Sequence, residues 1–409
     1  MITTINNKHK KLNVPNLRFP KFEGEWKEER LADIADLYKG TGISKDQLSD
    51  DGEPCILYGE LYTKYKSETI KEVISKTNID NTKLVRSKAN DVIIPCSGET
   101  AEDIATARCV LNDNILLGGD LNIIRLHGYD GTFMSYQLNG KRKYDIAKVA
   151  QGVSVVHLYG EHLKGVKTIN PCLEEQKKIA SLLALLDERI ATQNKIIDKL
   201  QSLIKGLNDL LYTQYGGEVL TSFAELGTSY SGLSGKSAQD FGSGKPFITY
   251  LNVYSNNVIK ENDFQYVAIK DDEKQNVVKY GDVLFTLSSE TPEEVGVGSV
   301  YLGKEKVYLN SFCFGIHITN TEVAFPPYLS YYVSLTAFRK FIYPYAQGST
   351  RFNLCKADFE KASIKLPTLA DQKRIYSVLG HIDCKIETER QMLNLYNSQK
   401  QYLLRQMFI

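Results

Sequence analysis

The sequence predicts an α+β protein with a pseudo-two-fold internal repeat. We expect two tandem α/β domains separated by two long helices that form an antiparallel coiled coil. Two observations lead to this prediction: one stretch of sequence recurs at a nearly constant offset, and apolar residues follow a heptad pattern after each globular segment.

The repeat is clearest where the two long helices are predicted to begin. "NPCLEEQKKIASLLALLDERI" starts at Asn170 and "LPTLADQKRIYSVLGHIDCKI" starts at Leu366, an offset of 196. The same offset relates the two "AQG" stretches at Ala150 and Ala346. The identical pairs within the helices include Pro171/Pro367, Gln176/Gln372, Lys177/Lys373, Ile179/Ile375, Leu183/Leu379, Asp187/Asp383 and Ile190/Ile386. The chain therefore contains two copies of one unit, each with a globular part followed by a helix.

The similarity continues upstream at slightly smaller offsets. "LADIADLYKG" at 31 matches "FAELGTSYSG" at 223, "PCILYGELY" at 54 matches "PFITYLNVY" at 246, and "NDVIIPCSGET" at 90 matches "GDVLFTLSSET" at 281. Small changes of offset indicate loop insertions. The predicted divisions are an N-terminal arm, a first domain, a central helix, a second domain and a C-terminal helix, at residues 1–23, 24–168, 169–214, 215–365 and 366–409.

Each globular part has a mixed α and β pattern. Short apolar runs bounded by Gly, Asn and Asp predict strands. These runs are "DVIIPC" at 91, "LNIIRL" at 121, "KPFITYLNV" at 245, "DVLFTL" at 282 and "FCFGIHI" at 312. "PPYLSYYVSLTAFRKFI" at 326 predicts one helix opened by proline.

The second part of each unit carries an apolar seam with alternating spacings of four and three, typical of a coiled coil. The apolar seam positions are Ile179, Leu183, Leu186, Ile190, Ile197, Leu200, Ile204, Leu207 and Leu211 in the first copy, and Ile375, Leu379, Ile382, Ile386, Leu393, Tyr396, Leu403 and Met407 in the second. Polar interruptions stand at Gln193, Glu389 and Lys400.

A helix over residues 173–213 is about 60 Å long at 1.5 Å per residue, and a seam of that length requires a partner. The repeat itself is the obvious partner, which predicts antiparallel pairing and a stiff spacer between two domains. In the alternative arrangement each helix packs only on its own domain. Thr368 with Asp371 resembles an N-terminal capping box for the second helix.

Composition limits the class of protein. The chain has 409 residues, and its hydrophobic fraction of 42% is ordinary for a globular protein of two or three domains. No apolar run reaches the ~18 residues of a membrane helix, and no apolar segment follows the basic N-terminus, so we expect a cytoplasmic protein. The net charge of +1 excludes a simple DNA-coating protein, so nucleic-acid binding would need local patches.

The sequence contains no recognisable catalytic or metal-binding motif. Seven cysteines without a C-x-x-C pair, and six histidines without ligand spacing, predict neither a disulfide framework nor a metal site. "SGLSGKSAQ" from Ser231 has the final GK[ST] of a phosphate-binding loop, but Tyr230 replaces the first glycine, which favours an ordinary turn. "NPCL" at 170 lacks the aromatic residue of an amino-methyltransferase motif, so we interpret Pro171 as a helix-preceding breaker.

These features together resemble the specificity subunit of Type I restriction-modification systems. The resemblance rests on the tandem order, the "DVIIPCSGET" and "DVLFTLSSET" segments, "AQG" before each helix, the twin "P-x-L-x-x-Q-K-[KR]-I" helix starts, and "VPNLRFPKFEGEW" at 14. It covers essentially the whole chain.

The resemblance implies a non-catalytic subunit with two target recognition domains, each reading one half of a split DNA sequence. It implies an antiparallel coiled coil that sets the spacer between the half-sites and docks two modification (methyltransferase) subunits. It also implies restriction (translocase/endonuclease) subunits as further partners. S-adenosylmethionine, ATP and Mg are then cofactors of the partner subunits, and this chain has none.

Base reading requires donors and acceptors on loops that reach the major groove. The candidates in the first domain are Tyr58, Glu60, Tyr62, Lys64, Ser97, Glu99 and Thr100, with Lys141, Arg142 and Lys143 for phosphates. The candidates in the second domain are Tyr250, Asn252, Tyr254, Ser288, Glu290 and Thr291, with Lys340 and Arg351 for phosphates. Residues shared by both copies have an alternative role in the scaffold, because halves that read different sequences should differ at their base contacts.

Two other functions compete with this interpretation. One is a coiled-coil scaffold that joins two protein-binding domains without DNA specificity, which the near-neutral charge permits. The other is a nucleotide hydrolase, which rests on the "SGLSGKS" turn alone.

Overall fold

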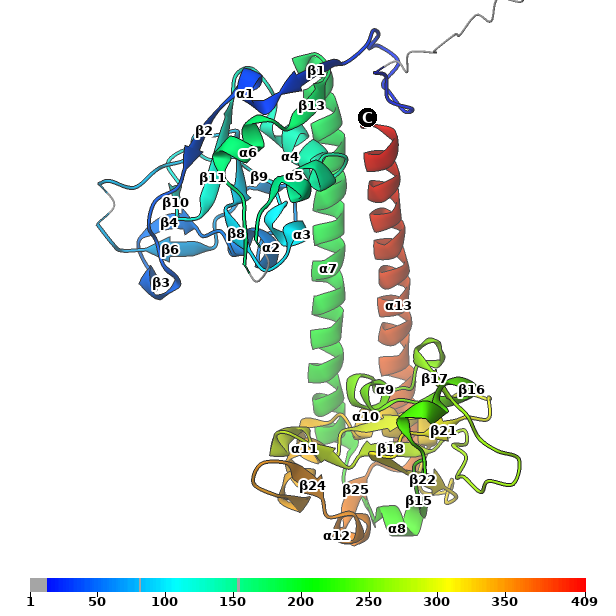
Figure 1. Ribbon diagram of the computed structural model, residues 1–409. Coiled ribbons are helices and arrows are strands. Elements are labelled where there is room, and N and C mark those ends of the chain that lie inside the picture. The colour runs from blue at the N-terminus through cyan, green and yellow to red at the C-terminus, as the bar shows by residue number, and fades with distance from the viewer. Residues whose placement is uncertain (1–12, 81, 153–154) are drawn as a thin grey trace, which may run out of the picture. The chain divides into compact units, whose positions relative to one another are not determined.

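The computed structural model describes residues 13–80, 82–152 and 155–409 (Figure 1). The chain forms two compact units, which we call unit 1 (Met1–Asn194 with Gln391–Ile409) and unit 2 (Lys195–Arg390). Both boundaries fall inside the two long helices, α7 (Leu173–Tyr215) and α13 (Leu369–Gln406), so each unit contains part of each helix.

Unit 1 contains the first globular domain, which Figure 1 draws from blue to green beside the first part of α7. Its strands are β1 (Lys27–Arg30), β2 (Ala35–Lys39), β3 (Leu48–Ser49), β4 (Glu53–Ile56), β5 (Thr69–Ile70), β6 (Ser75–Thr77), β7 (Asp91–Pro95), β8 (Ser97–Gly98), β9 (Arg108–Val110), β10 (Leu116–Leu117), β11 (Leu121–Leu126), β12 (Val156–His157) and β13 (Lys167–Asn170). Its helices are α1 (Leu31–Ile34), η1 (Lys45–Gln47), α2 (Glu60–Thr63), α3 (Ala101–Ile104), α4 (Gly131–Asn139), α5 (Lys143–Val149) and α6 (Gly160–Lys164).

The main sheet of unit 1 has the order β2-β11-β7-β9-β5 and is buried on both faces. Along β7, Val92 and Ile94 belong to the apolar cluster formed with α4, α5 and α6, whereas Ile93 belongs to the cluster formed with β4 and β10. Successive side chains of a strand point to opposite faces, so covering both faces explains why "DVIIP" is apolar throughout its centre.

The helix segments of unit 1 pack against each other in opposite directions. Ile179 and Leu183, near the start of α7, share a cluster with Leu403, Met407 and Phe408, at the end of α13. The N-terminal segment covers the same end, since the Leu17 N–H donates to the Gln406 carbonyl at 2.9 Å.

Unit 2 contains the second globular domain. Its strands are β14 (Val219–Thr221), β15 (Gly227–Ser231), β16 (Phe241–Ile248), β17 (Gln265–Val267), β18 (Val283–Thr286), β19 (Ser288–Ser289), β20 (Gly298–Val300), β21 (Tyr308–Leu309), β22 (Cys313–Ile318), β23 (Ala346–Gln347), β24 (Phe352–Leu354) and β25 (Ile364–Leu366). Its helices are α8 (Phe223–Leu226), η2 (Ala238–Asp240), α9 (Tyr250–Ser255), η3 (Glu261–Asp263), η4 (Pro292–Glu294), α10 (Pro326–Tyr332), α11 (Thr336–Ile342), η5 (Tyr343–Tyr345) and α12 (Lys356–Lys361).

The two domains share one topology, which confirms the predicted internal repeat. The order β15-β22-β18-β20 in unit 2 corresponds to β2-β11-β7-β9 in unit 1. The register corresponds as well, because Leu284 lies opposite Gly315 as Ile93 lies opposite Ile123. The helix segments of unit 2 are also antiparallel, with Leu207 and Leu211 packed in the same cluster as Ile375 and Leu379. The predicted antiparallel helix pair is thus present in each unit.

Two predictions about local structure are wrong. The strand predicted over "KPFITYLNV" ends at Ile248, and the helix α9 begins at Tyr250, because the Thr249 hydroxyl caps it by accepting the Asn252 N–H at 3.1 Å. The single helix predicted at 326 is two helices, α10 and α11. Thr336 starts the second by bonding its N–H and hydroxyl to Asp209, at 2.9 and 2.7 Å.

The long helices start where the sequence predicts. Leu173 opens α7 two residues after Pro171, and Thr368 caps α13 by accepting the Asp371 N–H at 3.2 Å. Every position of the predicted seam is buried or half-buried in both helices. Among the described residues, none of the helices combines the length and hydropathy that a membrane crossing requires.

Candidate functional site

A shallow depression of about 290 Å³ in unit 2 brings several predicted residues together. Its lining consists of Tyr250, Leu251, Tyr254, Ser288, Ser289, Glu290, Glu294, Phe312 and Arg351. These side chains come from α9, from β19 and the turn after it, from the loop before β22, and from the turn between β23 and β24. Of the second-domain candidates, Tyr250, Tyr254, Ser288, Glu290 and Arg351 therefore lie on one surface.

Polar contacts fix the floor of this depression. The hydroxyls of Tyr254 and Ser289 donate to the two oxygens of Glu294 at 2.7 and 2.9 Å, and the Tyr250 hydroxyl donates to the Ser288 carbonyl at 2.8 Å. The hydrogen bond from Tyr254, and after it the one from Ser289, lower the pKa of Glu294. The bond between Tyr254 and Glu294 also raises the pKa of Tyr254. Glu294 is thus an ionised carboxylate committed to its neighbours, while Glu290 is exposed at the rim.

The "AQG" stretch forms a tight turn beside the depression. Gly348 has a φ of 146°, and a Cβ there would lie 2.1 Å from the carbonyl oxygen of Arg351. Only glycine adopts this turn without a clash. Gly152 in unit 1 is equivalent, with a φ of 128° and the Val155 carbonyl oxygen at 2.0 Å. The glycine shared by both copies therefore shapes the turn that presents the variable residue, Arg351 or Val155.

The same surface of unit 1 is built on β8 and β12. The hydroxyl of Ser97 lies 3.3 Å from Nδ1 of His157, and the Thr100 hydroxyl accepts the Asp103 N–H at 3.1 Å as the cap of α3. Thr291 occupies the matching cap position before η4 in unit 2. Burial raises the pKa of Tyr62, with the Tyr58 hydroxyl and Asp103 as further causes. Thr100 thus caps α3, whereas Thr291 occupies the equivalent position without a capping hydrogen bond from its side chain.

One candidate from each copy belongs to the interior. Glu60, 5% exposed, accepts the Leu57 N–H at 3.0 Å and the Lys64 ammonium at 2.6 Å. Asn252, 2% exposed, donates to the Lys260 carbonyl at 2.8 Å and accepts the Lys260 N–H at 3.1 Å. The Glu60 contacts hold the two ends of α2, and the Asn252 contacts hold the segment after α9. Glu60, Lys64 and Asn252 therefore have a structural role in this geometry.

The predicted phosphate-binding residues outside the depression lie on other helices. Arg142 precedes α5 and donates to the Ile409 carbonyl at 3.0 Å and to Asp145 at 3.2 Å, which ties it to the end of α13. Lys141 and Lys340 are exposed, and Lys143 is half-buried. The structure does not bring these basic side chains together with the depression residues.

Two polar contacts attach each domain to the helix that follows it, and they explain several identities in the repeat. Gln176 donates to the Pro171 carbonyl at 2.8 Å and accepts the Asp130 N–H at 2.9 Å. Gln372 donates to the Pro367 carbonyl at 2.9 Å and accepts the Phe325 N–H at 2.8 Å. Each amide thus joins the helix start to the loop before α4 or α10.

The second repeated contact joins a domain tyrosine to a helix aspartate. The Tyr136 hydroxyl donates to Asp187 at 2.7 Å in unit 1, and the Tyr331 hydroxyl donates to Asp383 in unit 2. Sequence reasoning found these glutamines and aspartates as identities but did not predict their role, because their partners lie in another part of the domain.

Removing one amide tests this attachment. We expect Gln176→Leu to lower the free energy of unfolding of unit 1 by about 1–3 kcal/mol, because it leaves the Asp130 N–H and the Pro171 carbonyl buried without partners. Urea unfolding followed by the fluorescence of Trp26, the one tryptophan in the sequence, measures unit 1. Gln372→Leu is the matched control in unit 2; an equal shift of the Trp26 transition by both variants would contradict the assignment.

Unit 1 adds a buried charge network that unit 2 lacks at the matching positions. The Lys400 ammonium lies 2.7 Å from Glu68 Oε2 and 2.7 Å from Asp187 Oδ1, and its side chain is 16% exposed. In unit 2, Ile204 occupies the place of Lys400 in the repeat. Asn257 occupies the place of Glu68, because the Val300 N–H donates to the Asn257 carbonyl at 2.9 Å as the Cys109 N–H donates to the Glu68 carbonyl at 2.8 Å. Lys400 therefore joins α13, α7 and the first domain at one point.

The charges of this network shift one another's pKa. Burial lowers the pKa of Lys400, but the carboxylates of Glu68 and Asp187 outweigh it, so the pKa is raised overall. Burial raises the pKa of Glu68, and Lys400 offsets this only in part. Lys400 is therefore a charged ammonium that stabilises two carboxylates in the interior.

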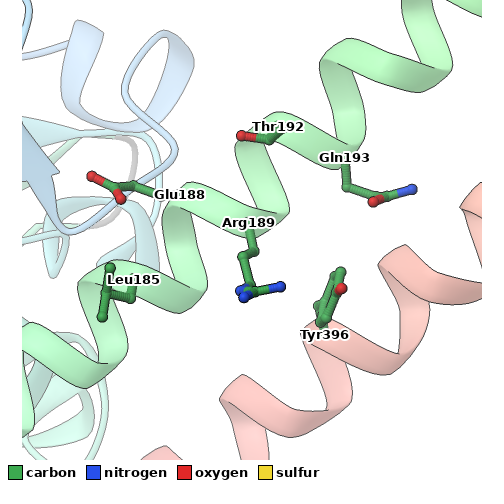
Figure 2. Close-up of a pocket in the computed structure, with 6 residues that line it drawn as sticks. All are labelled: Leu185, Glu188, Arg189, Thr192, Gln193 and Tyr396. Carbon is green, nitrogen blue, oxygen red and sulfur yellow. The ribbon is translucent and has the colours of Figure 1, made fainter.

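A shallow groove of about 370 Å³ lies where the seam of unit 1 meets its polar interruption. Figure 2 shows Arg189 and Gln193 of α7 pointing toward Tyr396 of α13, with Glu188 and Thr192 on another side of the helix.

The "SGLSGKS" stretch is an ordinary turn in this structure. The Lys236 ammonium is bound within the domain, at 2.5 Å from Glu273 and 2.7 Å from the Ala268 carbonyl. Its side chain is 8% exposed, so it is committed to these partners. Within the described ranges, no group of three or more His, Cys, Asp or Glu side chains is arranged to hold a metal ion.

A comparison with protein families agrees with the repeat. The sequence model described as "Type I restriction modification DNA specificity domain" matches residues 23–202 and again residues 227–395. A relative from Methanocaldococcus jannaschii, "Putative type I restriction enzyme MjaX specificity subunit", is 25% identical over 437 aligned positions, which cover 93% of this chain and 92% of that protein.

Solved structures show the same fold. The crystal structure of a Type-I restriction-modification system S subunit from M. genitalium aligns with a TM-score of 0.59 at 15% identity, covering 97% of this chain and 99% of that one. A chain from a study of complex assembly and conformational transition of the type I R-M system aligns with a TM-score of 0.56 at 15% identity, covering 95% and 98%.

Proposed function

The chain belongs to the family of Type I restriction modification DNA specificity domains, whose role is DNA recognition, and on this premise we propose how it performs that role. Each of its two domains reads one half of a split DNA site. The helix pair formed by α7 and α13 sets the number of base pairs between the halves. The resemblance noted in the sequence is thereby confirmed at the level of the family.

One observation supports this proposal most directly. Both domains have the same topology and attach to the following helix through the same glutamine and aspartate contacts, yet they differ at exposed positions around the depression. A shared scaffold with different exposed residues suits two readers of two different sequences. Half-sites on one face of B-DNA are about 34–36 Å apart.

The proposal assigns the chemistry to other subunits. In it, two modification subunits dock on the helices and methylate adenine with S-adenosylmethionine, and restriction subunits supply ATP- and Mg-dependent translocation and cleavage. This chain is then non-catalytic and works in the cytoplasm, where the host DNA lies. Its near-neutral charge fits a chain whose partners supply much of the phosphate contact.

A domain exchange tests the proposal. Replacing residues 24–168 with the same segment of another family member is expected to change one half of the methylated motif in the host and leave the other half intact. The unexchanged chain is the control, and methylation mapping with and without each chain is the measurement. A host whose methylation is the same with and without this chain would overturn the proposal and favour the protein-binding scaffold.

A further inference from the structure

The structure aligns the two depressions residue by residue. The Leu287 N–H donates to the Phe312 carbonyl at 2.8 Å, as the Cys96 N–H donates to the Asp120 carbonyl at 2.7 Å. Phe312 therefore occupies the place of Asp120. The pairing of Ser288 with Asn353 matches that of Ser97 with His157.

These correspondences separate shared from variable positions. Asn353 and His157 therefore occupy equivalent positions in the two domains. Two residues earlier in the chain, Arg351 of unit 2 is equivalent to Val155 of unit 1. The shared pairs are Tyr250/Tyr58, Tyr254/Tyr62, Ser288/Ser97 and Glu290/Glu99. The variable pairs are Leu251/Gly59, Ser289/Gly98, Glu294/Asp103, Phe312/Asp120 and Arg351/Val155. Leu251, Phe312 and Arg351 are the exposed members of the variable set in unit 2, and all three line one depression.

Two of these three residues are apolar side chains that are largely exposed. Leu251 is 69% exposed and Phe312 is 55% exposed. The Arg351 guanidinium lies over the Phe312 ring, 5.8 Å from its centroid. A leucine and a phenylalanine grouped on the surface beside an arginine indicate a contact with a partner that is apolar at one point and negatively charged nearby.

We propose that Leu251 and Phe312 contact the 5-methyl group of a thymine in the half-site read by the second domain, with Arg351 holding the ring and facing the negatively charged DNA. This inference rests on the proposed function. In the major groove of duplex DNA the thymine methyl is the apolar group that a protein reads, and phenylalanine is among the side chains that suit it. In the first domain, Asp120 and Gly59 stand in the places of both apolar side chains.

The test removes the methyl group from the DNA and the apolar side chains from the protein. The chain is assembled with its modification subunits, and its Kd is measured for the mapped site with thymine or uracil at each A·T pair of the second-domain half. Exchange of residues 24–168 identifies this half as the one that stays constant. The variants are Leu251→Ala with Phe312→Ala, and Leu220→Ala is the matched control, since Leu220 is 67% exposed elsewhere in unit 2.

For the unchanged chain, uracil at one position is expected to weaken binding about fourfold, the effect of one methyl group. The double variant binds the thymine site as weakly as the unchanged chain binds the uracil site, and uracil has no further effect on it. Leu220→Ala behaves as the unchanged chain does.

Three results overturn the inference, and one of them also overturns the proposed function. The methyl contact is contradicted if the second-domain half contains no A·T pair. It is also contradicted if uracil weakens binding of the double variant as much as binding of the unchanged chain. Neither result contradicts the reading of a split site. If the chain binds every duplex equally, both the methyl contact and the proposed function are contradicted.

Discussion

Lys400→Met is expected to destabilise unit 1 by about 3–5 kcal/mol near neutral pH, the largest effect we predict for a single substitution. Methionine keeps the length of the side chain but removes the charge. Glu68 and Asp187 then lose the cation bonded to both of them, and Arg108 is the positive charge that remains near them. Urea unfolding followed by Trp26 fluorescence measures the change, since Trp26 is 2% exposed and packs in unit 1 against Phe133.

The control is an exposed pair in the same unit. Lys167 bonds Glu28 at 2.7 Å with side chains 55% and 47% exposed, so Lys167→Met is expected to change the free energy of unfolding by less than about 1 kcal/mol. Adding Glu68→Gln to Lys400→Met should restore part of the lost stability, because it removes one of the two unpaired charges. Equal effects of the two lysine variants would show that the buried network does not stabilise unit 1.

The loss of unfolding free energy caused by Lys400→Met also depends on pH. The folded pKa of Glu68 lies above its ordinary value of 4.5, so folding favours the protonated carboxyl. The contribution of the protonated Glu68 carboxyl to stability is fully present below the ordinary pKa and is lost as the pH rises through the folded pKa. Without Lys400 the folded pKa rises further. The deficit of Lys400→Met is therefore expected to be larger at about pH 8 than at about pH 5.

Lengthening both helices is expected to change the spacer of the methylated motif and neither of its halves. A heptad inserted after Gln193 in α7, with a matching heptad after Glu389 in α13, adds about 10 Å of helix and preserves the seam. Because the two insertions lie close to the boundaries of the units, each unit keeps its own contacts. At 3.4 Å per base pair the spacer grows by at most about three base pairs.

Methylation mapping in the host measures this result. The control inserts the same seven residues into the turn at Gly235, far from the helices in sequence, which should leave the spacer unchanged. A spacer of constant length after one and after two inserted heptads would show that the helices do not set it.

The sequence was sufficient for the parts of the fold that depend on local pattern. The seam and the caps of α7 and α13 are local, so their helices begin near the predicted residues. "TYLNV" was read as a strand because Tyr and Val favour strands, but the Thr249 cap and the packing of Val253 in a core select a helix. The break before Thr336 depends on Asp209, which no local pattern indicates.

The candidate site was predictable only in part for a related reason. Tyr250, Ser288 and Arg351 were found because they are polar residues in loops near recurring motifs. Leu251 and Phe312 were missed because an apolar residue in an apolar stretch is ordinarily buried. Their exposure depends on the whole domain, and their difference from Gly59 and Asp120 becomes informative only when the structure places them side by side.

The division of the long helices between the units has a consequence for synthesis. Of the two domains, the one in unit 1 is synthesised first. Lys400, Met407 and Phe408, near the other end of the sequence, nevertheless belong to unit 1 and complete its core. Unit 2 is complete in residues 195–390. The domain that leaves the ribosome first is therefore the last to be finished, and a message truncated after residue 390 yields a chain whose second domain is intact and whose first lacks part of its core.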